Sequence, residues 1–218
     1  MLMVTNLVGF GAATTGGNDA NTILLLHFDG VDGATSSTDS AQYGKTLTFG
    51  GSAQIDTAQS KFGGSSLLLN TSSTVTVADD AAWDLGTGDF TVDYWIRFAA
   101  LSDQYIFNFN TNILRHQRRP TGNLDIYLAG SDIGDRATTL VANTWHHLAI
   151  TRSGTTLRQF QDGSQLGANY TSSGNITGVT GIKIGDGGIG VNGWIDEFRV
   201  SNVARWTANF TPPTAAYS

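Results

Sequence analysis

The sequence predicts an all-β fold, an antiparallel β-sandwich built from short strands and tight turns. The first observation behind this prediction is composition, because the 218 residues include 27 glycines and only 14% charged residues. Such a chain is rich in turn formers and poor in helix formers. The second is alternation. In residues 90–98 four apolar side chains, Val92, Tyr94, Ile96 and Phe98, fall on one face of an extended strand, and Thr91, Asp93, Trp95 and Arg97 fall on the other.

Residues 145–163 give the third observation, a hairpin followed by a second tight turn. Two alternating runs flank Ser153-Gly154, and the second run ends at Asp162-Gly163. Asp-Gly after an alternating run is a strong signal for a two-residue β-turn. We therefore expect two antiparallel strands here.

The remaining strands are expected wherever apolar or β-branched runs end at turn residues. Residues 79–85 are expected to form one helical turn, with Asp79 and Asp80 near its start. Turn signals such as Gly63-Gly64 and Gly122-Asn123 separate the strands. The further predicted strands are residues 23–28, 65–69, 74–77, 105–109, 124–128, 181–184 and 194–200.

The chain divides into a short arm, residues 1–22, and one sandwich domain, residues 23–218. A single sandwich of about 200 residues is ordinary. In the arm, the apolar residues Leu7, Val8 and Phe10 precede a stretch rich in glycine and threonine. Since an apolar tip on a flexible stalk needs a surface to lie against, we expect these three residues to assemble the protein with a neighbour.

Charge and hydropathy exclude several classes of protein. The net charge is −6, whereas nucleic-acid binders are usually basic, so we expect no nucleic acid as a partner. No run approaches the ~18 apolar residues of a membrane span. Cysteine is absent, which excludes disulfides and thiolate metal sites. The first residues lack the charged start and unbroken apolar core of a signal peptide.

Five segments, in this order along the chain, resemble a laminin-G-like domain of the concanavalin A-like superfamily. The similarity covers about residues 23–213. It implies a jelly-roll sandwich, a fold that carries lectins, glycosidases and inert structural modules. The segments are Leu25-Leu-His-Phe-Asp-Gly30, Phe62-Gly-Gly-Ser-Ser-Leu67, the stretch from Trp83 to Trp95, the hairpin beginning Trp145-His-His-Leu-Ala149, and Trp194-Ile-Asp-Glu-Phe-Arg-Val-Ser201 with Ala204-Arg-Trp206.

The resemblance also implies a structural Ca²⁺ at the edge of the sandwich. Residue by residue, its ligands map to Asp196, to Asp29 or a neighbouring carbonyl, and to Gly63 or Gly64. Oxygen-only ligation suits Ca²⁺. Alternation places Asp196 on the same face as Trp194 and Phe198, so we expect it to point inward. A buried carboxylate needs a partner, and backbone N–H groups or an arginine are the alternatives to calcium.

Glycoside hydrolysis is not expected. That chemistry needs two carboxylates about 5 to 10 Å apart across the scissile bond. Glu197 is the one glutamate of the chain. Neighbouring strand residues point to opposite faces, which would separate Glu197 from Asp196. The sequence therefore predicts a protein that is not an enzyme.

The only basic cluster comprises Arg115, Arg118 and Arg119. It is either a solvated hairpin edge or a contact for a partner, which would be an acidic glycan or an acidic neighbouring copy of the chain. Sugar rings stack on exposed aromatic side chains, and the sequence does not separate exposed from buried ones. The stacking candidates are Trp83, Tyr105, Tyr127 and Tyr170.

Two functions follow as expectations. The first is a non-catalytic structural or assembly protein. A laminin-G-like module with an arm, without cysteine or signal peptide, resembles phage virion proteins such as capsid decoration, tail or fibre components. Its partners would be other virion proteins or copies of itself, at the virion surface. The alternative is an extracellular glycan-binding adhesin that contacts carbohydrate on a host surface.

Overall fold

The computed structural model describes residues 17–110, 112–186 and 188–218. The predicted arm residues Leu7, Val8 and Phe10 lie outside this range. The described chain contains one short 3₁₀ helix and otherwise strands and loops. The elements are β1 (Thr22–Leu26), β2 (Leu47–Gly50), β3 (Gln54–Asp56), β4 (Ser66–Leu69), β5 (Thr74–Val77), η1 (Ala81–Trp83), β6 (Phe90–Phe98), β7 (Gln104–Phe109), β8 (Leu114–Arg118), β9 (Leu124–Leu128), β10 (Ser131–Arg136), β11 (Trp145–Ser153), β12 (Thr156–Gln161), β13 (Ser164–Gln165), β14 (Tyr170–Thr171), β15 (Ile182–Ile184) and β16 (Gly193–Ser201).

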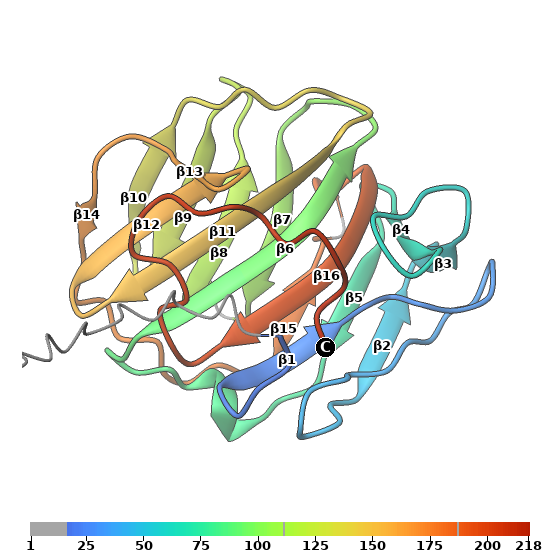
Figure 1. Ribbon diagram of the computed structural model, residues 1–218, viewed down its shortest axis with the longest axis horizontal. Coiled ribbons are helices and arrows are strands. Elements are labelled where there is room, and N and C mark those ends of the chain that lie inside the picture. Colours follow the sequence, from blue (N-terminus) through green and yellow to red (C-terminus); the bar gives the residue numbers. More distant parts are fainter. Residues whose placement is uncertain (1–16, 111, 187) are drawn as a thin grey trace, which may run out of the picture.

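Two stacked sheets confirm the predicted sandwich (Figure 1). The nine-stranded sheet has the order β13-β12-β11-β6-β16-β4-β3, with β1 also paired to β16 and β14 to β12. The seven-stranded sheet has the order β10-β9-β8-β7-β15-β5-β2. Every strand pair in both sheets is antiparallel.

The core lies between the sheets and is centred on aromatic side chains. Tyr94 of β6 stacks on Phe198 of β16, with ring centres 5.6 Å apart. It also meets the edge of Phe107 of β7 at 5.9 Å. The apolar face predicted for residues 90–98 is therefore the core face. Trp83, a candidate for sugar stacking, is fully buried in this core, so that candidate was wrong; η1, capped by Asp80, holds it there.

The predicted turns form where the sequence places them. Asp162 and Gly163 both have positive φ, 50° and 77°, as a two-residue type I′ hairpin requires. They join β12 to β13, and Gly154 at φ 58° lies between β11 and β12. In the part of the chain that the structure describes, no helix is long and apolar enough to cross a membrane.

The chain after β16 returns across the outer face of the nine-stranded sheet (Figure 1). Trp206 of this segment packs against Ala149 and Phe160. Near its end, Tyr217 packs against Leu25 and Ala41. The outer face of this sheet is therefore covered by the protein's own chain along β1, β11 and β12.

Candidate functional site

A continuous row of polar and aromatic residues crosses the seven-stranded sheet. The register places one residue of each strand opposite the next, in the row Asp132, Tyr127, Arg115, Asn108, Lys183, Thr76 and Thr48. The adjacent row is the core row: Ile126, His116, Phe107, Ile184, Val75 and Phe49. Because side chains alternate along a strand, the first row lies on the outer face, which we call the seven-stranded face.

Tyr105 joins this face through a β-bulge in β7. The register shifts between Tyr105 and Phe107, and Tyr105 pairs with Gln117. The guanidinium carbon of Arg115 lies 4.6 Å from the ring centre of Tyr105 and 4.9 Å from that of Tyr127. Such distances allow cation–π attraction, which holds both rings in place. The centre of the face is therefore an ordered tyrosine–arginine–tyrosine platform.

Four buried side-chain atoms on this face have no hydrogen-bond partner among the described residues: Asn108 Oδ1, Arg115 Nε, Gln117 Oε1 and Asp125 Oδ1. Buried polar groups are nearly always hydrogen-bonded. Together with two partly exposed tyrosines, these side chains give the face polar groups beside aromatic rings, a combination that ligand sites also use.

The predicted basic cluster does not form a cationic patch. Arg119 Nη2 lies 2.7 Å from Asp125 Oδ2 and 2.9 Å from Asp132 Oδ2. Arg115 is 3.8 Å from the carboxylate of Asp132. Arg118 falls on the opposite side of β8, where its Nη1 donates to the carbonyl of Ser102 at 2.7 Å. Arg115 and Arg119 therefore lie on the seven-stranded face as ion-paired groups, and Arg118 does not.

The residues predicted for calcium meet at the turn before β4. The carboxylate of Asp29 stands against Gly63, where a Cβ atom would lie 1.8 Å from its Oδ1. Asp196 Oδ2 accepts from the backbone N–H groups of Lys61 and Phe62 at 2.8 and 3.0 Å. The Gly64 N–H donates to the Phe62 carbonyl at 2.7 Å. Glycine at position 63 is thus required by the approach of Asp29.

The orientation predicted for Asp196 was wrong. A β-bulge in β16 shifts the register between Asp196, opposite Trp95, and Arg199, opposite Asp93. Glu197 at the bulge has a positive φ of 52°. Alternation is interrupted there, so Asp196 and Glu197 both lie on the outer side of the nine-stranded sheet, and both are buried. The expected divergence of the two carboxylates was therefore wrong too.

His27 belongs to this cluster and was not expected there. Its Nδ1 lies 2.7 Å from Glu197 Oε1, and this hydrogen bond raises the pKa of His27. Burial raises the pKa of Asp196 to about 7, although the two amide donors lower it. The apolar run of residues 23–28 predicted a strand, but it could not place His27 beside a residue 170 positions away.

The fit of a cation to this cluster rests on Asp196 Oδ1, which is buried and has no hydrogen-bond partner among the described residues. That oxygen and the Asp29 carboxylate are the hard ligands that Ca²⁺ prefers. No group of three or more His, Asp or Glu side chains in the described chain is arranged to hold a metal. Any Ca²⁺ here would need backbone carbonyls as further ligands, as the family resemblance implies.

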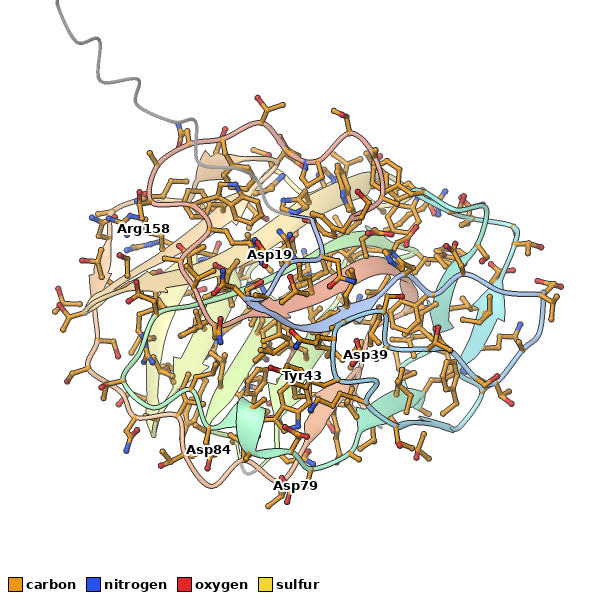
Figure 2. All side chains as sticks on the ribbon, turned by 60° about the horizontal axis from the view of Figure 1, so that its bottom comes forward. Asp19, Asp39, Tyr43, Asp79, Asp84 and Arg158 are labelled. Carbon is orange, nitrogen blue, oxygen red and sulfur yellow. The ribbon has the colours of Figure 1, made fainter. Side chains whose placement is uncertain are left out.

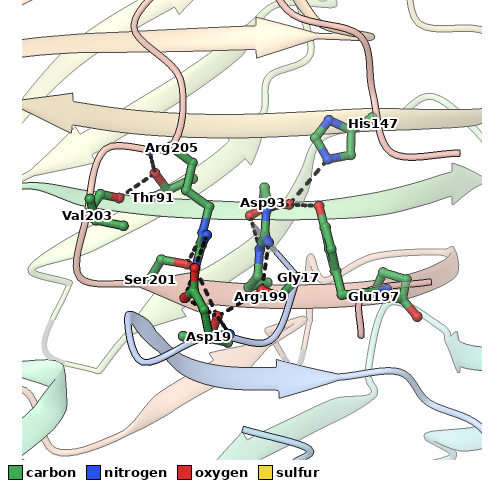
Figure 3. A network of polar contacts seen from close by, with 12 residues as sticks. Gly17, Asp19, Thr91, Asp93, His147, Glu197, Arg199, Ser201, Val203 and Arg205 are labelled. Atoms are coloured by element: carbon green, nitrogen blue, oxygen red, sulfur yellow. Dashed lines mark hydrogen bonds and ion pairs between the residues drawn. The ribbon is translucent and has the colours of Figure 1, made fainter. Parts of the chain in front are cut away.

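A second buried cluster surrounds Asp93 on the outer side of β6 (Figure 3). Asp93 Oδ1 accepts from Arg199 Nε at 2.9 Å, and Asp93 Oδ2 lies 3.3 Å from His147 Nε2 and accepts from Tyr217 Oη. The Arg199 guanidinium lies 3.6 Å from the centre of the Tyr217 ring. All four residues are buried. The covering chain segments therefore make this cluster structural rather than a site open to ligands.

Comparison with known families agrees with the β-sandwich fold. A laminin-G-type family model, described as the concanavalin A-like lectin/glucanases superfamily, matches residues 69–209, which is more than half of the chain. The chain belongs to this superfamily. A comparison with curated proteins found no match.

Solved structures with the same fold include domain 4 of AbnA, an extracellular arabinanase of Geobacillus stearothermophilus, in complex with arabinotriose. Its TM-score is 0.64 at 18% identity, over 84% of this chain and 93% of that one. A botulinum neurotoxin type C structure, whose cell entry depends on two ganglioside molecules, has a TM-score of 0.62 at 13% identity, over 84% of this chain. This chain covers about half of the toxin chain, 48%. At identities this low, the structural similarity shows a shared fold and nothing more.

Proposed function

We propose that the chain is a non-catalytic carbohydrate-binding domain that holds a glycan on the seven-stranded face. The observation that carries this proposal is the tyrosine–arginine–tyrosine platform with four unpaired polar atoms beside it. A sugar ring offers apolar C–H faces for aromatic rings and hydroxyl groups for unpaired donors and acceptors. Two structural neighbours support a glycan as the ligand, since one was solved with arabinotriose and the other depends on gangliosides for cell entry.

We propose that the chain is not catalytic because the two carboxylates of β16 are buried. Asp196 and Glu197 lie on the same side of the sheet, but each already has partners within the protein. Glu197 binds His27 and accepts from the N–H of Tyr217 at 2.9 Å, and Asp196 accepts two amides. Two buried carboxylates under the protein's own chain cannot flank a glycosidic bond.

Tyr127→Ala is expected to weaken glycan binding about threefold to tenfold per site, because one aromatic contact contributes ~0.5–1.5 kcal/mol. Binding should be measured on a glycan array with the protein displayed in many copies, since avidity raises weak signals. Tyr43→Ala is the matched control. Tyr43 (Figure 2) is 54% exposed and lies in the loop before β2, an edge strand that β5, β15 and β7 separate from β8 and β9. Equal binding by the Tyr127 variant and the unchanged protein would contradict the proposed site.

We further propose that Asp29 and Asp196, with carbonyls of the Gly63-Gly64 turn, hold a structural Ca²⁺. A ligand that binds only the folded state stabilises it. EDTA should therefore lower the melting temperature and added Ca²⁺ should restore it, and Asp196→Asn should remove this response. Asp79→Asn, on an exposed loop, should keep it. A melting temperature that EDTA does not change in the unsubstituted protein would leave Asp196 bound by its two amides alone.

The assembly role stays a prediction that concerns the arm. Leu7, Val8 and Phe10 lie outside the described residues, as does most of the predicted arm. A place in a phage virion, with other virion proteins or copies of the chain as partners, is compatible with glycan binding if the sandwich is displayed outward. In that arrangement the adhesin function and the structural function would belong to the same molecule.

A further inference from the structure

The unpaired atoms of the seven-stranded face differ in chemistry. Asn108 Oδ1, Gln117 Oε1 and Asp125 Oδ1 are hydrogen-bond acceptors, and only Arg115 Nε is a donor. All four atoms are covered by neighbouring side chains, so a ligand pairs with them once those side chains turn outward, and a sugar hydroxyl can then donate to each oxygen. A carboxylate, sulfate or phosphate oxygen can only accept, so it would leave the three acceptors unpaired. The vacant hydrogen-bonding positions therefore favour a ligand rich in hydroxyl groups.

The charged side chains of this face also favour an uncharged ligand. Its cations are Arg115, Arg119 and Lys183, and its carboxylates are Asp103, Asp125, Asp132 and Asp135. Both arginines are already committed to carboxylates, Arg119 at 2.7 and 2.9 Å and Arg115 at 3.8 Å. An anionic group approaching the platform would meet more carboxylates than cations, and the nearest guanidinium would already be neutralised.

We propose that the ligand of the seven-stranded face is an uncharged glycan and that Asp132 excludes anionic ones. This inference rests on the proposed function and names its ligand class. Asp132 is 53% exposed in its side chain and contacts both arginines. It therefore stands at the surface, where it meets an approaching ligand before Arg115 does. The expectation that the basic run serves an acidic glycan is replaced by this one.

The first test is a glycan array in which each neutral glycan is printed beside its sialylated or sulfated form. We expect signal on neutral glycans, a weaker signal on their charged forms, and little change between low and high salt, because no net ion pair forms on binding. Stronger binding to the charged forms, lost at high salt, would overturn the inference and leave the proposed function standing. Absence of any glycan binding would overturn the proposed function itself.

The second test removes the charge by which Asp132 would exclude anionic glycans. Asp132→Asn removes the negative charge that pairs with Arg115 and Arg119, and it should raise the ratio of charged to neutral binding about fivefold. Asp79→Asn makes the same change of net charge on an exposed loop (Figure 2) and should leave the ratio unchanged. An unchanged ratio in the Asp132 variant, or an equal rise in both variants, would refute the role of Asp132.

Discussion

Asp93→Ala is expected to lower the free energy of unfolding by about 3–5 kcal/mol, because it removes one partner of a buried ion pair. Arg199 would keep its guanidinium fully buried while losing the carboxylate 2.9 Å away. His147 and Tyr217 would lose the same acceptor. The urea midpoint at neutral pH measures this loss, and Asp79→Ala on an exposed loop is the control, expected within ~0.5 kcal/mol of the unsubstituted protein.

The same ion pair gives the change a characteristic pH dependence. Burial alone would raise the pKa of Asp93, but Arg199 and His147 bring it down to about 2. The unfolded value is near 3.8. A depressed carboxyl pKa stabilises the folded state above the unfolded pKa, and this contribution is lost as the pH falls from 3.8 toward 2. The stability difference between Asp93→Ala and the unsubstituted protein should therefore shrink in that window, and a difference that stays constant down to pH 2 would contradict the account.

Arg152→Met is expected to destabilise the protein by about 3–4 kcal/mol, since three backbone carbonyls lose hydrogen bonds to a buried, charged donor. The Arg152 guanidinium, fully buried, donates to the carbonyls of Gly86, Gly88 and Gly174 at 2.8, 2.7 and 2.6 Å. These bonds fasten the loop before β6 to the loop after β14. The loss should appear as a lower urea midpoint and earlier hydrogen exchange in both loops.

Arg158→Met is the matched control for this prediction. Arg158 lies on the neighbouring strand β12 and is half-buried, and its Nη1 has no hydrogen-bond partner in the described part of the chain (Figure 2). The change of side chain is the same, but no carbonyl triplet is lost. Equal destabilisation by the two substitutions would show that the bonds of Arg152 contribute little.

Much of the sandwich could be predicted from local pattern. Residues 74–77, 90–98 and 124–128 form strands with the expected bounds, and the Asp162-Gly163 turn forms as expected. These segments combine clear alternation or β-branched runs with turn residues at their ends. Strands β8 and β10 were not expected, because polar and charged residues fill most of their positions. Strands β2 and β3 were also missed, because they are only four and three residues long.

The candidate site could be predicted only in pieces. Tyr105, Tyr127 and Arg115 were each singled out, but only the register of β7, β8 and β9 brings them together. The bulge at Glu197 could not be predicted, since no glycine marks the position where the register shifts and Glu197 takes a φ of 52°. That bulge reversed the expected direction of Asp196 and placed His27 beside Glu197.

Backbone NMR titration tests glycan binding on the seven-stranded face most directly. A neutral glycan selected on the array should be added to the isotope-labelled protein, and the amide shifts mapped along the chain. We expect the largest changes in β7, β8 and β9, around Tyr105, Arg115 and Tyr127. The largest changes in β6, β11 and β16, or in the loops that cover them, would contradict the claim.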